Sequence, residues 1–203
     1  KAVTNLATYK GIKQRTAGAW AEIGGSLGAT TVILPGGEVY PALERGVIDA
    51  TEWSSPSINE PVGFHKIAKY IIFPGIHQPG ATQECEFNKK AWDKIDAKDQ
   101  AAIKMAGELR TFRAWTNHAY NDLYAYRRME KGGNTMLRLE DSFIKVAQKA
   151  ANDWADAVVT KEPNNKWFKK MLNHQRQFQM DMSVYSKMRS APGSRTAIGS
   201  ILK

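Results

Sequence analysis

Three side chains in this sequence stand at or just beyond the ends of predicted strands, where a binding site is expected. Arg15 closes the strand-like run 11–15, and Glu52 and Trp53 end the apolar run that begins at Val47. A guanidinium can hold a carboxylate through two parallel hydrogen bonds, and ligands collect at the carboxyl ends of strands in open α/β folds. The alternatives are a surface Arg on an edge strand and a surface Glu beside a core Trp.

A fourth candidate region is the run from Pro74 to Gly80, which has a Pro-Gly pair at each end of Ile76-His77-Gln78. Proline and glycine fix the backbone, so the run predicts a rigid loop that presents His77 or Gln78 to a ligand. The alternative is an ordinary turn with exposed polar tips.

Other kinds of chemistry find little support. The four histidines show neither an HExxH nor a Cys/His metal spacing. No nucleophile elbow or phosphate-binding loop is present. The single cysteine, Cys85, lies between two glutamates, which disfavour the thiolate that a nucleophile needs.

The elements that must position the candidate residues alternate between strand and helix over residues 9–81. Strands are predicted at 11–15, 30–34, 47–53 and 70–73, with helices at 20–27, at 40–45 and from Ser55-Pro56 onward. Such alternation predicts a mostly parallel α/β sheet. Gly28 and Gly46 are the expected ends of the first two helices.

After residue 82 the sequence predicts one strand, 83–88, and then mainly helices. A long helix begins at a cap on Asp96 and ends at Gly132-Gly133, a second covers 143–158, and a third starts at Pro163. Their stripes of aromatic and Met residues predict core packing rather than a cofactor site. The segment 191–203, rich in Ser, Gly and basic residues, predicts a loose tail.

The composition is ordinary for a globular protein of 203 residues, with 42% hydrophobic and 24% charged residues. No apolar run approaches the roughly 20 residues of a membrane-spanning helix. A net charge of +9 favours anionic partners, but the basic residues are spread along the chain. A solvated surface therefore explains the charge better than a nucleic-acid-binding arm does.

Several runs together resemble one family, the extracytoplasmic solute-binding subunits of TRAP transporters (DctP type), in the branch that binds 2-oxo acids and related monocarboxylates. The most specific is the block from Gly37-Glu38-Val39-Tyr40-Pro41-Ala42-Leu43 to Glu52-Trp53. The others are Gly11-Ile12-Lys13-Gln14-Arg15, Pro74-Gly75-Ile76-His77-Gln78-Pro79-Gly80 and Phe87-Asn88-Lys89-Lys90-Ala91-Trp92, and all follow the family's order.

The resemblance implies a periplasmic protein that binds a small organic acid, delivers it to membrane subunits and catalyses no reaction. Arg15 would bind the ligand's carboxylate, Gln78 would add a polar group, and Tyr40 of the specific block is a further expected ligand contact. Glu52 and the Trp53 main chain or ring would help to hold a cation, Na or Ca, that bridges to the ligand. The C-terminal helix is the expected surface for a homodimer.

Two departures from the family pattern bear on the cation. Ile76 stands where the family usually has Trp, and Gln78 stands where it usually has Glu. The loss of one carboxylate weakens a cation site, because hard cations are held chiefly by charged oxygen ligands.

The resemblance also implies the organisation of the chain as the C-terminal part of a two-lobed periplasmic-binding-protein-like fold. Residues 1–80 would form the α/β core of the second lobe, 81–130 a strand and long helix that cross to the first lobe, and 131–190 the C-terminal helices. Most of the N-terminal lobe would be missing, so the isolated chain is expected to bind its ligand poorly.

Two other functions stay open at this point. The first is an α/β enzyme that acts on a small carboxylate with Glu52 as general base, and the second is a basic nucleic-acid-binding module. Loss of turnover in Glu52→Gln would support the first, and steeply salt-dependent binding to DNA or RNA would support the second.

Overall fold

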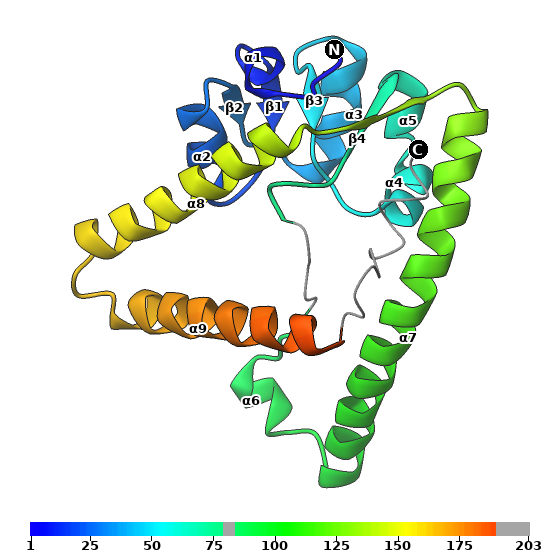
Figure 1. Cartoon of the computed structure of the whole chain (residues 1–203). Coiled ribbons are helices and arrows are strands. Elements are labelled where there is room, and N and C mark those ends of the chain that lie inside the picture. The colour runs from blue at the N-terminus through cyan, green and yellow to red at the C-terminus, as the bar shows by residue number, and fades with distance from the viewer. Residues whose placement is uncertain (79–83, 190–203) are drawn as a thin grey trace. The chain divides into compact units, whose positions relative to one another are not determined.

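The computed structural model describes residues 1–78 and 84–189. The chain divides into two compact units, Lys1–Ala151 and Asn152–Lys203, and each is described by itself. Figure 1 labels the helices and strands along the chain. The predicted tail, 191–203, lies outside the described residues.

The first unit contains a parallel sheet of three short strands. The central strand β1 (Lys13–Arg15) pairs with β2 (Thr30–Val32) on one side and β3 (Ala50–Thr51) on the other. Helices α2 (Trp20–Ser26) and α3 (Gly36–Glu44) connect these strands. The predicted alternation of strand and helix is therefore confirmed, although only 50–51 of the predicted strand 47–53 form a regular ladder.

A second sheet of the same unit pairs β4 (Tyr70–Phe73) in parallel with β5 (Thr135–Arg138). The bounds of β4 match the predicted strand 70–73. The strand β5 was not predicted, because four residues between a Gly-Gly stop and the next helix are too short to show a period.

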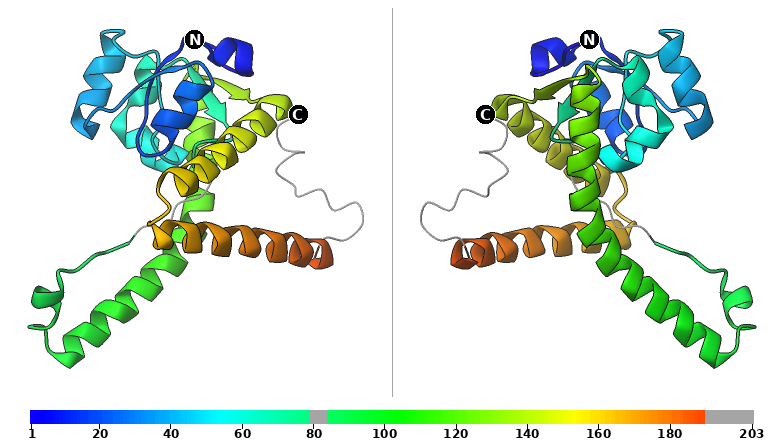
Figure 2. Two further views of the ribbon diagram at one scale, coloured as in Figure 1. Left: turned by 90° about the vertical axis from the view of Figure 1, so that its left-hand side faces the viewer. Right: turned by 90° about the vertical axis from the view of Figure 1, so that its right-hand side faces the viewer.

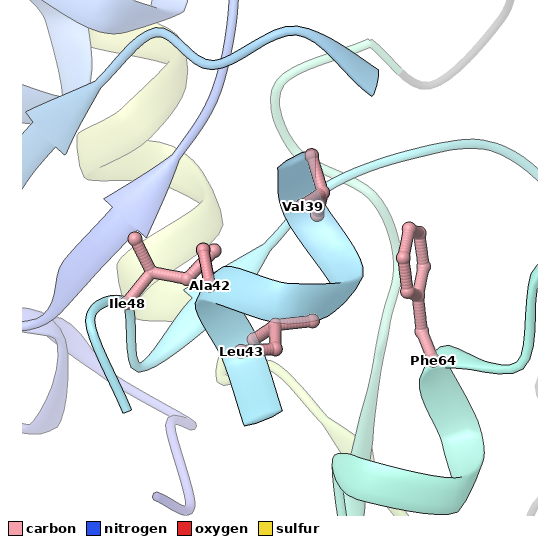
Figure 3. Packing of buried hydrophobic residues seen from close by; sticks show 5 residues of the cluster. All are labelled: Val39, Ala42, Leu43, Ile48 and Phe64. Atoms are coloured by element: carbon pink, nitrogen blue, oxygen red, sulfur yellow. The ribbon is translucent and has the colours of Figure 1, made fainter. Parts of the chain in front are cut away.

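A cluster of buried apolar residues packs α3 against the segment before β3 and against α5. Val39, Ala42 and Leu43 lie on one face of α3 at helical spacing, and Ile48 and Phe64 pack against them (Figure 3). Phe64 begins α5 (Phe64–Ile67). Each fully buried Val, Leu, Ile or Phe side chain stabilises the fold by about 1.5–3 kcal/mol relative to an exposed one.

The long helix α7 (Ala97–Lys131) has the predicted ends. The Asp96 side chain accepts a hydrogen bond of 2.9 Å from the Asp99 N–H, and Gly132 follows the last turn. α4 (Pro56–Val62) lies beside the later part of α7, as both views in Figure 2 show.

Two polar contacts fix α4 against α7. The Asp122 carboxylate accepts from the Ser57 N–H at 2.8 Å and from the Ser57 hydroxyl at 2.5 Å. Arg128 donates two hydrogen bonds to Glu60, of 2.8 and 2.6 Å, and this guanidinium lowers the pKa of the Glu60 carboxyl.

The prediction that the apolar stripe of α7 is core is wrong for much of the helix. Leu109, Phe112 and Leu123 are 48%, 64% and 40% exposed. Ala125 and Met129 are buried, and the Tyr126 ring packs against Phe73 with 5.7 Å between centroids. Nothing in the described part of the chain covers the exposed stretch.

The predicted strand 83–88 is also wrong. Residues 84–88 form no regular strand, and Gln83 lies outside the described residues. The Asn88 side chain instead accepts from the N–H groups of Lys90 and Ala91 and begins α6 (Lys89–Trp92). Cys85 is exposed rather than a strand residue.

The second unit joins the end of α8 (Asp141–Lys161) to α9 (Lys166–Arg189). The rings of Trp154 and Phe168 meet edge to face, and Arg176 pairs with Asp156 at 2.7 Å. α9 begins at Lys166 rather than at Pro163, because the Asn165 side chain accepts from the Phe168 N–H at 3.1 Å.

The prediction that the apolar residues of α9 are core is wrong as well. Trp167, Met171 and Phe178 are 71%, 68% and 57% exposed. None of the helices within the described ranges is long and apolar enough to span a membrane.

Candidate functional site

The site is built at the carboxyl ends of parallel strands. Arg15 is the last residue of β1, Glu52 directly follows β3, and His77 lies in the loop after β4. Leu34, which supplies a carbonyl to the site, follows β2. The ends of β1, β2 and β3 in the first sheet and of β4 in the second therefore bring together residues from four separate segments, at the strand ends where open parallel sheets bind ligands.

The Arg15 guanidinium is fixed by the main chain and by a carboxylate. Its Nε and Nη2 donate to the Leu34 carbonyl at 3.2 and 3.1 Å, and its Nη1 donates to Glu52 Oε1 at 3.1 Å. The Arg15 and Glu52 side chains are only 12% and 13% exposed. These bonds engage three of the five N–H donors of a guanidinium and hold its plane in one orientation.

The Glu52 carboxylate lies between two nitrogen groups. Its Oε1 accepts from Arg15, and its Oε2 lies 3.0 Å from His77 Nε2. Burial of a carboxylate is costly unless it is paired and hydrogen-bonded. Arg15 meets this requirement at Oε1, and the His77 imidazole lies within pairing distance of Oε2.

Trp53 forms the apolar wall of the site. The Arg15 guanidinium lies over its ring, 5.3 Å from the centroid, and Phe64 meets the ring edge-on at 5.4 Å. Gly36 makes this packing possible, since a Cβ there would lie 2.8 Å from the ring. Trp53 thus links the Arg15 site to the core cluster under α3.

Of the predicted site residues, the structure brings together Arg15, Glu52 and Trp53. Tyr40 is half-buried on α3, where it packs against the core cluster. Gln78 is exposed, and its neighbour His77 is the residue that meets Glu52. The roles of Tyr40 and Gln78 as ligand contacts stay predictions.

Sequence reasoning missed one part of the site and left a second undecided between two residues. The Leu34 carbonyl carries no signal in the sequence, because any residue type offers the same group. His77 lay in the loop predicted to present a polar side chain, and only its contact with Glu52 distinguishes it from Gln78.

A cavity of about 440 Å³ opens beside the site, lined by Glu52, Trp53 and His77 among others. The Glu52 carboxylate and the main-chain carbonyl of Trp53 are hard oxygen donors of the kind that Ca²⁺ and Na⁺ accept. Within the described ranges no group of three or more His, Cys, Asp or Glu side chains is placed to hold a metal ion. These two oxygen donors are of the type that a hard cation prefers. Most of the other oxygen ligands of the cation would have to come from a bound acid or from residues outside the described ranges.

Comparison with known proteins gives one consistent result. Residues 1–162 match the family of bacterial extracellular solute-binding proteins, family 7 (DctP). The chain is 27% identical over 188 residues to the monocarboxylate 2-oxoacid-binding periplasmic protein of a Nostoc species, covering 93% of this chain and 51% of that protein.

Solved structures of TRAP solute-binding proteins share the fold. One from Bordetella bronchiseptica, a dimer with calcium and picolinate, is 27% identical with a TM-score of 0.81 and covers 93% of this chain and 55% of its own. One from Colwellia psychrerythraea, with calcium and pyruvate, is 26% identical with a TM-score of 0.73 and covers 93% and 59%. The chain thus spans about half the length of these relatives. It belongs to the DctP family of solute-binding proteins, the extracytoplasmic subunits of TRAP transporters.

Proposed function

We propose that this chain is part of a periplasmic TRAP subunit that captures a small organic acid, a 2-oxo or 2-hydroxy monocarboxylate, and delivers it to membrane subunits. The observation that carries the proposal is the fixed Arg15 guanidinium at the strand ends, paired with Glu52 beside a cavity. The Nostoc relative, which is a 2-oxoacid-binding protein, and the Colwellia relative, whose structure contains pyruvate, support this ligand class.

In this proposal Arg15 binds the acid through the two guanidinium N–H groups that donate to neither Leu34 nor Glu52. The bonds to the Leu34 carbonyl orient those N–H groups before the ligand arrives, so little side-chain entropy is lost on binding. Trp53 shields the guanidinium on one face, which lowers the local dielectric constant and strengthens its attraction for a carboxylate.

The Glu52 carboxylate repels an acid unless a positive charge stands between them. A bound cation would supply that charge, and Glu52 with the Trp53 carbonyl would hold it, as calcium accompanies the acids in the Bordetella and Colwellia proteins. A 2-oxo or 2-hydroxy oxygen lets an acid chelate such an ion, whereas a simple carboxylate offers a single group. This preference defines the proposed ligand class.

Replacement of Glu52 by glutamine tests this role. The variant keeps the size of the side chain and one acceptor oxygen but removes the charge. We expect pyruvate affinity to fall about 10–100-fold and to lose its dependence on added calcium, as measured by titration calorimetry with and without a chelator.

Propionate, which lacks the 2-oxo group, is the matched control ligand for Glu52→Gln. Its affinity should be weak in the wild type and should not fall further in the variant. An equal loss for both acids would show that Glu52 only supports the local structure, and unchanged calcium dependence would contradict its role with the cation.

The chain matches only about half of its relatives, and this affects the ligand affinity that we expect of the chain alone. In two-lobed proteins the ligand is enclosed when both lobes close on it, and this chain spans about half of its relatives. We propose that residues outside this chain supply the opposing wall. The calorimetric tests therefore use the full-length polypeptide.

The family consists of transport components rather than enzymes, so the alternative with Glu52 as general base has no support. The family's ligands likewise favour small acids over nucleic acid as the anionic partner.

We also propose a homodimer through α9. Its exposed residues Trp167, Met171 and Phe178 offer an apolar surface, and the Bordetella neighbour is a dimer. Light scattering on the full-length protein should give twice the monomer mass, and Met171→Lys should shift the mass toward the monomer. A monomeric wild type at tens of micromolar would contradict this proposal.

A further inference from the structure

The main chain directly after Trp53 is held by one side chain, that of Asn59. Asn59 Oδ1 accepts from the Ser54 N–H at 2.9 Å, and Asn59 Nδ2 donates to the Ser54 carbonyl at 3.0 Å. A single side-chain amide therefore engages both main-chain polar groups of Ser54. Trp53, Ser54 and Asn59 all line the cavity beside the site.

The first of these bonds sets the direction of the Trp53 carbonyl. The Ser54 N–H and the Trp53 C=O belong to the same peptide group, which is planar and trans. In such a group the N–H and the C=O point in opposite directions, so fixing the N–H on Asn59 also fixes where the Trp53 oxygen points. The bond to the N–H polarises the peptide group and makes its oxygen a stronger electron-pair donor.

The Trp53 carbonyl is oriented but not used within the fold. Among the residues that the structure describes, no group donates a hydrogen bond to it. The preceding carbonyl, that of Glu52, accepts from the Thr51 hydroxyl at 2.9 Å. The Trp53 oxygen is therefore available to a ligand, whereas the Glu52 main-chain oxygen already has a partner.

Asn59 does not act as a cap of its own helix. It lies inside α4, where its N–H bonds the Ser55 carbonyl at 2.9 Å. A capping side chain accepts from the N–H groups of the first helical turn. The Asn59 amide instead bonds Ser54, which lies before the helix, so its hydrogen bonds order the main chain beside the site.

We propose that Asn59 is a positioning residue for the cation, acting through the peptide group between Trp53 and Ser54 rather than as a ligand. This inference rests on the proposed function, in which Glu52 and the Trp53 carbonyl hold a cation beside the acid. Main-chain carbonyl oxygens are among the ligands that Ca²⁺ accepts. Groups that orient such ligands from behind contribute about 10–100-fold to metal affinity.

The test compares Asn59→Leu with Asn59→Asp in the full-length polypeptide. Leucine is similar in size and has neither hydrogen-bonding group, whereas aspartate keeps an acceptor for the Ser54 N–H. Calorimetric titration of calcium in the presence of pyruvate should give an affinity about tenfold or more lower in Asn59→Leu. Asn59→Asp should recover most of this loss.

A second measurement needs neither calcium nor pyruvate. In the calcium-free protein the Ser54 N–H should exchange with solvent faster in Asn59→Leu than in the wild type, because its acceptor is gone. In Asn59→Asp the exchange should stay close to that of the wild type. This readout reports the hydrogen bond itself, separately from any effect of the added charge on the cation.

Asn134 provides the matched control. Its side-chain amide also bonds the main chain, donating to the carbonyls of His65 and Ala68 at 2.8 and 2.9 Å, but it lies just before β5, at the opposite end of the second sheet from His77. Asn134→Leu should lower the stability of the fold and leave calcium affinity unchanged.

Three results would overturn the inference. They are an unchanged calcium affinity in Asn59→Leu, an equal loss in Asn59→Leu and Asn59→Asp, and an equal loss in Asn59→Leu and Asn134→Leu. Each of these leaves the proposed function intact, because the wild type still binds pyruvate with calcium. A wild type that binds pyruvate without any dependence on calcium would instead contradict the proposed cation, and the role of Asn59 with it.

Discussion

Replacement of Arg15 by alanine is expected to lower the affinity for pyruvate about 100–1,000-fold. A carboxylate and a guanidinium 4 Å apart attract each other by about 4 kcal/mol at an effective dielectric constant near 20. About 1.4 kcal/mol corresponds to a tenfold change in affinity. Loss of Arg15 also leaves Glu52, which is 13% exposed, with His77 as its remaining partner, and this charge then opposes the acid.

Replacement of Arg15 by lysine tests whether the positive charge alone or the planar set of donors accounts for pyruvate affinity. The Arg15 guanidinium donates twice to the Leu34 carbonyl and once to Glu52. An ammonium is a point charge and lacks the planar fork of donors that makes these contacts together. We expect Arg15→Lys to bind pyruvate more weakly than the wild type but more tightly than Arg15→Ala.

Arg128 provides the matched control for Arg15. It also pairs with a glutamate, at 2.6 Å, but its side chain is 59% exposed and the pair holds α4 to α7 away from the site. Arg128→Ala should leave pyruvate affinity unchanged and should change the stability of the fold very little, as is usual for exposed pairs. Equal losses of affinity in the two variants, or a normal affinity in Arg15→Ala, would contradict the assigned role of Arg15.

The first half of the chain was predictable because its signals are local. Gly28 and Gly46 follow the ends of their helices with positive φ, of 96° and 70°, and the apolar run 70–73 coincides with β4. The same local signals placed Arg15 and Glu52 at strand ends. Their mutual contact followed from the parallel order of the strands, in which such ends share one edge.

The wrong predictions, for the stripes of α7 and α9 and for the strand 83–88, concern features that depend on contacts with other segments. An apolar stripe on a helix predicts a partner, and it cannot say whether that partner belongs to the same segment of chain. Phe112 of α7 and Trp167 of α9 are 64% and 71% exposed, so nothing in the described part of the chain covers them. The alternation over 83–88 likewise favoured a strand, but a strand forms only where a neighbour offers hydrogen bonds, and Asn88 begins a helix instead. From the sequence, His77 could be predicted only as one of two polar residues that its loop presents to a ligand.

Phe143→Ala is expected to have the largest effect on stability, a loss of about 3–5 kcal/mol in the free energy of unfolding. Phe143 is 1% exposed, near the start of α8, and its ring packs against Tyr9 with 5.3 Å between centroids. The Tyr9 hydroxyl donates to Gln14 of β1 at 2.6 Å, and burial raises the pKa of Tyr9. Truncation of Phe143 therefore loosens the contact that attaches α8 to the central strand.

Urea unfolding of Phe143→Ala and of Phe178→Ala measures this effect against a matched control. Phe178 is the same residue type on α9 but is 57% exposed, so its truncation in the monomer should change stability by no more than about 0.5 kcal/mol. Similar small losses in both variants would show that α8 is not anchored through Phe143. Because Gln14 precedes Arg15 in β1, a folded Phe143→Ala protein that keeps its pyruvate affinity would further show that the site depends on the strand ends and not on the packing beneath them.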